Sequence, residues 1–144
     1  MTAVTFPMTV PVWRRAPSAA ALSVPTACVD WARRIEPLAR GLADLPAGWD
    51  GDDAPAPTEG TIRIALDELR RFTPAGVPMP QVHPTVGGGV QFEWHCCGWS
   101  VEVEVTPSGQ TIAWAETQSG DQGWDGTLPE VREALITTLK HLAA

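Results

Sequence analysis

The feature that most constrains the fold of this chain is a strict alternation of apolar and polar residues in two neighbouring segments. The segments VQFEW (90–94) and WSVEVEV (99–105) place an apolar residue at every second position. This period of two is typical of strands with one buried face. The spacer HCCG (95–98) is short enough to be a hairpin turn. The sequence therefore predicts two antiparallel strands.

The residues that follow and precede this hairpin predict further strands. TPSG (106–109) contains the Pro and Gly that a turn requires. TIAWA (111–115) then predicts a third strand, with Ile112 and Trp114 facing the core. QVHPTV (81–86) predicts a short strand ahead of a glycine hinge at 87–89. Together these segments predict a three- to four-stranded antiparallel meander.

Helical periodicity flanks the predicted meander. Pro37 interrupts the first apolar pattern, which predicts one short helix ending near Arg34 and another over 36–44. Thr58 is a predicted N-cap for a helix that ends near Phe72. The predicted buried stripe of that helix is Ile62, Ala65, Leu66, Leu69 and Phe72.

The C-terminal segment TLPEVREALITTLKHLAA predicts a closing amphipathic helix. Thr127 and Glu130 have the spacing of a capping box, and Pro129 suits the first turn. The predicted fold class is α+β, with helices before and after the meander packed on one face of it.

The composition predicts a single folded domain. Of 144 residues, 44% are hydrophobic and 19% are charged, as in ordinary globular proteins. Residues 1–25 are rich in Pro and Ala and predict a loose arm, in which Trp13 would dock or TVPVW would add an edge strand. Residues 26–144 form the predicted α+β domain. Three cysteines, no signal-peptide pattern and no long apolar run favour a cytoplasmic protein without membrane association.

The charge balance argues against nucleic acid as a direct ligand. The net charge is −7, and residues 1–29 contribute +2 through Arg14 and Arg15, so the remaining residues carry −9. A chain that binds a phosphate backbone needs clustered basic residues. Here the arginines form no stripe and Lys140 is the single lysine.

The tetrapeptide Gly-Trp-Asp-Gly occurs twice, at 48–51 and at 123–126. We interpret both copies as loops that precede helices, with Trp at the edge of the core, Asp bonded to backbone N–H groups and Gly at positive φ. The alternative is that Asp50, Asp52 and Asp53 bind a hard cation such as Ca²⁺. DGDD lacks the spacing of a calcium loop.

His95, Cys96 and Cys97 suggest a zinc site at first, but adjacent cysteines cannot easily present both sulfurs to one ion. His83 and Cys28 are distant in sequence. A Cys97 nucleophile activated by His95 or His83 finds no support in the spacing. We therefore expect a simple hairpin turn, with no catalytic residue, no metal ligand and no cofactor.

The polar positions of the predicted hairpin form the candidate binding surface. Glu93, Glu102 and Glu104 share its outer face with Gln91 and His95. An acidic row of this kind suits a protein partner with a basic surface. The other candidate binding residues are Trp49 and Asp50 of the first loop.

Two segments resemble those of a known group of proteins. The loop GWDGDDAPAP and the strand PTVGGGVQFEW resemble motifs of small uncharacterised bacterial and phage proteins, over roughly residues 38–116. That resemblance transfers no established activity, but it implies an accessory protein of mobile or defence-related loci. Asp52 and Asp53 stand where such relatives often have an aromatic residue and a glycine.

These observations favour a non-enzymatic, acidic protein-binding domain, such as an antitoxin, immunity or anti-defence factor. One alternative is a small metal-dependent hydrolase that uses Asp50, Asp52, Glu93 or His95. Another is a self-assembling structural protein that forms a homodimer through its sheet edges.

Overall fold

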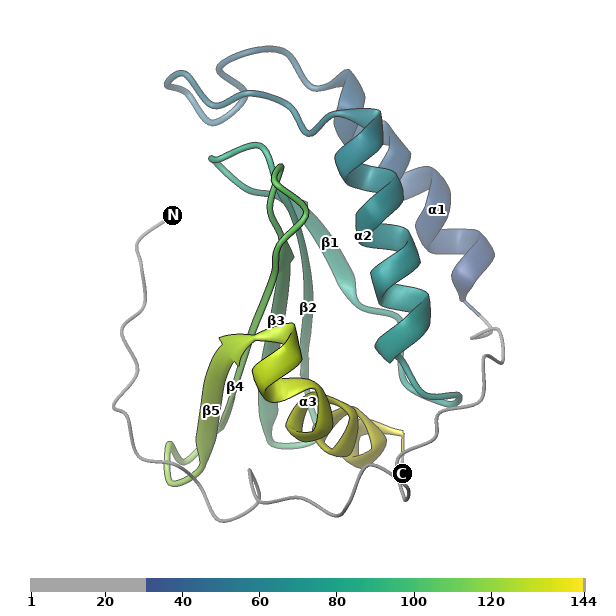
Figure 1. Ribbon diagram of the computed structural model, residues 1–144, viewed down its shortest axis with the longest axis vertical. Coiled ribbons are helices and arrows are strands. Elements are labelled where there is room, and N and C mark those ends of the chain that lie inside the picture. The colour runs from purple at the N-terminus through teal and green to yellow at the C-terminus, as the bar shows by residue number, and fades with distance from the viewer. Residues whose placement is uncertain (1–30, 144) are drawn as a thin grey trace.

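The computed structural model describes residues 31–143 of the chain (Figure 1). The predicted arm at 1–25, including Trp13, lies outside the described residues. So do Cys28 and the first part of the predicted helix that ends near Arg34.

Helices and strands are segregated along the chain, as is typical of the α+β class. In chain order they are α1 (Ala32–Gly41), the short 3₁₀ helix η3 (Leu42–Asp44), α2 (Glu59–Phe72), β1 (Gln81–Pro84), β2 (Val90–Cys96), β3 (Trp99–Val105), β4 (Thr111–Thr117), β5 (Gly123–Thr127) and α3 (Leu128–Leu142). The strands form one sheet in the order β1-β2-β3-β4-β5, and each neighbouring pair is antiparallel. The predicted α+β class with an antiparallel meander is confirmed.

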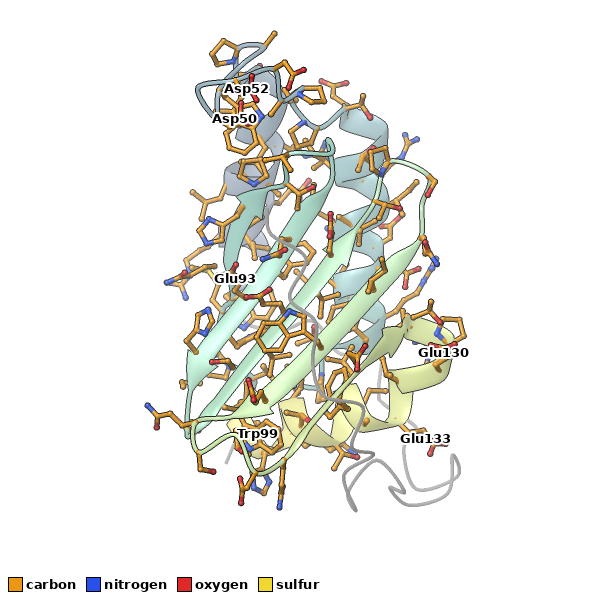
Figure 2. The ribbon with its side chains drawn as sticks, turned by 90° about the vertical axis from the view of Figure 1, so that its left-hand side faces the viewer. Asp50, Asp52, Glu93, Trp99, Glu130 and Glu133 are labelled. Atoms are coloured by element: carbon orange, nitrogen blue, oxygen red, sulfur yellow. The ribbon has the colours of Figure 1, made fainter. Side chains whose placement is uncertain are left out.

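The core lies between the sheet and the helices. In Figure 2, which looks onto the sheet, the helices lie behind the strands. The alternate positions Phe92, Val103 and Trp124 belong to one buried cluster with Leu69 of α2 and Leu135 of α3. The other positions of each strand lie on the opposite side of the sheet, because side chains alternate along a strand.

The predicted strand count of three to four is wrong, because the second Gly-Trp-Asp-Gly forms strand β5 and is not a loop. Trp124 is 3% exposed, and its indole N–H donates to Thr138 Oγ1 at 3.1 Å. Gly126 lies against α3, where a Cβ would stand 2.9 Å from Val131 Cγ1. The absence of that Cβ allows α3 to start directly after the strand.

The predicted orientation of β4 is also wrong, since Ile112 and Trp114 lie on the outer face. The loop after β3 pairs Val105 with Thr111, and this register turns Ala113 and Ala115 toward the core. Both alanines are 1% exposed. Both belong to the core cluster, on the side of the sheet where α3 packs on β4.

The predicted break at Pro37 does not occur, because α1 continues through this residue. Pro37 is exposed, and so is Arg33, whose carbonyl loses its intrahelical partner. Water can satisfy that carbonyl, which reduces the cost of the proline. The buried residues of α1 are Ile35 and Ala39, whereas Leu38 is 54% exposed.

The two predicted helix caps are confirmed. The Thr58 hydroxyl caps α2 by accepting from the Thr61 N–H at 3.2 Å, and the Glu130 carboxylate accepts from the Thr127 N–H at 2.9 Å at the start of α3. The predicted turn HCCG is shorter than expected, because β2 continues through His95 and Cys96 and only Cys97 and Gly98 connect it to β3. Cys97 and Gly98 both have positive φ, as a two-residue type I′ turn requires.

Candidate functional site

The sheet face away from the helices is acidic. By the strand register it carries five carboxylates, which are Glu93, Glu102, Glu104, Glu116 and Asp125. Within residues 31–143 every lysine and arginine lies on a helix, namely Arg33, Arg34, Arg40, Arg63, Arg70, Arg71, Arg132 and Lys140. The α-helices also carry six carboxylates, which are Glu36, Glu59, Asp67, Glu68, Glu130 and Glu133. The helices are therefore close to neutral, whereas the outer face of the sheet has five acids and no lysine or arginine.

Glu93 and Glu102 form the centre of this face. They are direct partners in the β2–β3 ladder. The Gln91 side-chain amide donates to Glu93 Oε1 at 2.6 Å and to Glu102 Oε2 at 3.3 Å. Gln91 is 5% exposed although it lies on the outer face. One buried amide thus holds both carboxylates in place.

Two imidazoles face the remaining oxygen of Glu93. His95 Nε2 lies 3.2 Å from Glu93 Oε2, and His83 Nε2 of β1 lies 3.6 Å from the same oxygen. The other nitrogen of the His95 ring lies 3.1 Å from Ser100 Oγ. The β1–β2 pair thereby brings two sequence segments to one carboxylate, and the β2–β3 pair places Ser100 against His95.

Trp114 of β4 completes the cluster. Its indole N–H donates to Glu102 Oε2 at 2.9 Å. Burial and the neighbouring charge of Glu93 raise the pKa of Glu102, while the bond from Trp114 acts in the opposite direction. The Glu102 carboxylate is therefore held in an environment that favours protonation or a nearby positive charge.

The side chains of Glu93, His95 and Glu102 are placed so that three ligand atoms lie within 4.8 Å of one another. Across residues 31–143 this is the one group of three histidine, cysteine or acidic side chains that converges in this way. These three residues could hold a metal ion, and His83, whose Nε2 lies 3.6 Å from Glu93 Oε2, stands beside them. Glu104 lies opposite Gln91 and outside the group.

The structure does not bring Trp49 and Asp50 to this face. Asp50 lies in the loop at one end of the molecule, away from Glu93 (Figure 2). Its Oδ1 accepts from the N–H groups of Asp52 and Ala54 at 3.0 and 3.2 Å, and the Asp52 bond is the main cause that lowers the Asp50 pKa. Trp49 Nε1 donates to the Pro55 carbonyl at 3.0 Å. These contacts fit a structural turn.

The thiols are separated from the histidine that precedes them. His95 lies on the outer face, and the next residue, Cys96, points to the side of the core. Burial raises the pKa of the Cys96 thiol, with a further contribution from Cys97. A thiol that holds its proton is a poor nucleophile and a poor metal ligand.

Three members of the cluster were missed from the sequence: His83, Ser100 and Trp114. His83 is distant from the hairpin in sequence, and the pairing of β1 with β2 places it opposite Gln91. Trp114 is large and apolar, which in the sequence favours a core position. The register of the β3–β4 hairpin, in which Glu102 pairs with Trp114, is the signal that would have found it.

The comparisons with known proteins add no relative to this description. No protein-family model, no curated protein and no solved structure matches the chain. A membrane-spanning helix, which must be both long and strongly apolar, does not occur within residues 31–143.

Proposed function

We propose that the protein is a non-enzymatic binding domain that covers a basic surface of a partner protein with the outer face of its sheet. The observation that carries this proposal is the charge segregation, with five carboxylates on a face whose strands hold no lysine or arginine. Complementary charge steers association and suppresses wrong partners.

Apolar groups on the same face would supply contact area. Ile112 is 39% exposed, and Trp114 is half-buried beside Glu102. Aromatic side chains among polar neighbours are common in the centres of protein interfaces. The candidate contact residues are therefore Glu93, Glu102 and Glu104 with His95 and Trp114, while the buried Gln91 holds Glu93 and Glu102 in place.

The biological role would be that of an accessory factor. An antitoxin, immunity or anti-defence protein neutralises its target by covering it, which agrees with the role implied by the sequence resemblance. Such a factor would act in the cytoplasm, and its partner would be a protein and not a nucleic acid.

Self-association through sheet edges is the less favoured function. The edge strands β1 and β5 have four and five residues, and Pro84 in β1 has no N–H to donate. Short edges with proline discourage pairing between chains. Light scattering on the purified protein tests this, since a homodimer would have twice the mass of the monomer.

A pull-down with matched variants tests the binding proposal. The sheet variant carries Glu93→Gln, Glu102→Gln and Glu104→Gln. The control carries Asp44→Asn, Asp52→Asn and Asp53→Asn, which change the net charge equally at exposed positions outside the sheet. Bound proteins from the native host are identified by mass spectrometry at low and at high salt.

We expect one basic protein to be recovered with the wild type and with the control, and to be lost with the sheet variant or at high salt. Equal loss with both variants would assign the effect to net charge alone. A partner that binds equally at both salt concentrations would contradict the proposal. Thermal unfolding of each variant verifies that it folds.

A further inference from the structure

We propose that Glu93, His95, Glu102 and His83 bind one divalent transition-metal ion, for which Zn²⁺ is the probe. This inference does not rest on the proposed function, because metal binding is measured on the purified protein alone.

The spacing of the ligand atoms fits a tetrahedral ion. Zinc bonds to nitrogen and oxygen are about 2.0–2.1 Å long, which places neighbouring ligand atoms roughly 3.4 Å apart in a tetrahedron. Glu93 Oε2 lies 3.2 Å from His95 Nε2 and 3.6 Å from His83 Nε2. These two distances are close to that spacing, and Glu102 offers a further ligand atom within 4.8 Å of those of Glu93 and His95.

The donor types select the metal. Imidazole nitrogen with carboxylate oxygen suits zinc and related transition ions, whereas Ca²⁺ and Mg²⁺ prefer oxygen ligands alone. Two carboxylates balance the charge of a divalent ion, and two neutral imidazoles complete four ligands. His83 Nε2 lies 3.3 Å from Gln81 Oε1, and metal binding would replace this contact. Strands β1, β2 and β3 contain no lysine or arginine that would compensate Glu93 and Glu102 instead.

Hydrogen bonds from neighbouring residues already orient the ligands. Gln91 donates to Glu93 Oε1 and leaves Oε2 toward the histidines, while Ser100 Oγ lies 3.1 Å from His95 Nδ1. If Nδ1 carries the proton, Nε2 has its lone pair available for the metal. Trp114 donates to Glu102 Oε2. Partners of this kind are typical of metal sites, where they fix the ring orientation and the tautomer.

Isothermal titration of the metal-free protein with Zn²⁺ tests the proposal. The titration uses the full chain and, in parallel, a variant with Cys28→Ser, Cys96→Ser and Cys97→Ser, so that binding by thiols is recognised. The chain has three histidines, and the third, His141 on α3, provides a matched control. Both His83 and His95 are about half exposed, at 47% and 46%, so their replacement should leave the fold intact.

We expect one equivalent of Zn²⁺ in both backgrounds. His83→Ala and His95→Ala should each weaken binding at least about tenfold, while His141→Ala leaves it unchanged. Co²⁺ bound at the same site should give the intense visible absorption of a tetrahedral complex, and Ca²⁺ should not compete. Loss of binding in the cysteine-free variant, or equal weakening by His141→Ala, would overturn the proposal.

Discussion

Glu93 and Glu102 stand directly opposite each other on β2 and β3, on the face that the helices leave uncovered. Like charges at opposed positions of antiparallel strands destabilise a sheet. The Gln91 amide, which donates to both carboxylates, reduces this repulsion but brings no charge. The pair therefore retains a net repulsion that protonation, a metal ion or a basic partner would relieve.

The first prediction concerns the pH dependence of Glu102. Its folded-state pKa is raised above the ordinary value of 4.5, so the folded state holds the proton to a higher pH than the unfolded chain. The stability that this proton contributes is present below pH 4.5 and is lost as the pH rises through the raised pKa. The wild type should therefore lose stability relative to Glu102→Gln as the pH rises toward neutrality.

Urea denaturation of wild type and variant at several pH values measures this difference. Glu104→Gln is the control, because Glu104 shares the strand and the face but lies opposite the neutral Gln91. If the free energy of unfolding of the two variants depended on pH in the same way, the Glu93–Glu102 pair would not be the source of the effect.

The second prediction concerns two adjacent threonines in α3. Thr138 Oγ1 accepts from Trp124 Nε1 at 3.1 Å and donates to the Ala134 carbonyl at 2.8 Å. Thr138→Val would leave the indole N–H buried without this acceptor, so we expect a loss of about 1–3 kcal/mol in the free energy of unfolding. Thr137 Oγ1 is buried without a hydrogen-bond partner. Thr137→Val should therefore be neutral or stabilising in the same urea titration.

The third prediction compares two tryptophans that donate to carbonyl oxygens. Trp31 Nε1 donates to the Val77 carbonyl at 2.6 Å in the core, whereas the Trp49 bond to Pro55 is exposed. Trp31→Phe should cost about 1–3 kcal/mol, because the freed carbonyl is shielded from water. Trp49→Phe should cost much less. The free energy of unfolding is measured by chemical denaturation. If both variants lost the same amount, burial would not set the strength of these hydrogen bonds.

The fourth prediction concerns the loop that carries the first Gly-Trp-Asp-Gly. Gly48 and Gly51 both have positive φ, at 76° and 89°. A Cβ at Gly48 would stand 2.6 Å from the Asp52 carbonyl oxygen, whereas one at Gly51 meets open space. Gly51→Ala should cost about 1–2 kcal/mol from backbone strain alone, and Gly48→Ala should cost clearly more. Thermal unfolding of the two variants gives the comparison.

The fold was predictable from the sequence where one local pattern decides it. The alternation in β2 and β3, the Thr58 cap and the apolar stripe of α2 depend on neighbours in sequence, and all three appear as expected. The orientation of β4 and the strand at 123–127 depend on the packing of α3 against the sheet. The residues on that side of the sheet include two alanines and Gly126, and their small size gives no strong hydrophobic signal.

The candidate site was predictable only in part, for the same reason. Glu93, Glu102 and His95 were found because they occupy polar positions of an alternating hairpin. His83 and Trp114 join them through the registers of β1 with β2 and of β3 with β4. Trp49 and Asp50 of the first loop do not belong to the site. The repetition of the tetrapeptide is no sign of a shared role, since one copy is a turn and the other is strand β5.

The outer face of the sheet holds five acids and no lysine or arginine, whereas the α-helices hold eight lysines and arginines and six acids, so the described domain is an electric dipole in addition to an anion. A positively charged surface exerts a torque on a dipole before contact. At low ionic strength the protein would therefore approach such a surface with the outer face of its sheet in front. Salt shortens the reach of this torque to about 10 Å at 0.1 M. An anion-exchange matrix should therefore hold the molecule in one orientation, with its helices toward the solvent. Replacing acids of the sheet should lower the salt concentration at which the protein elutes by more than replacing the same number of acids elsewhere.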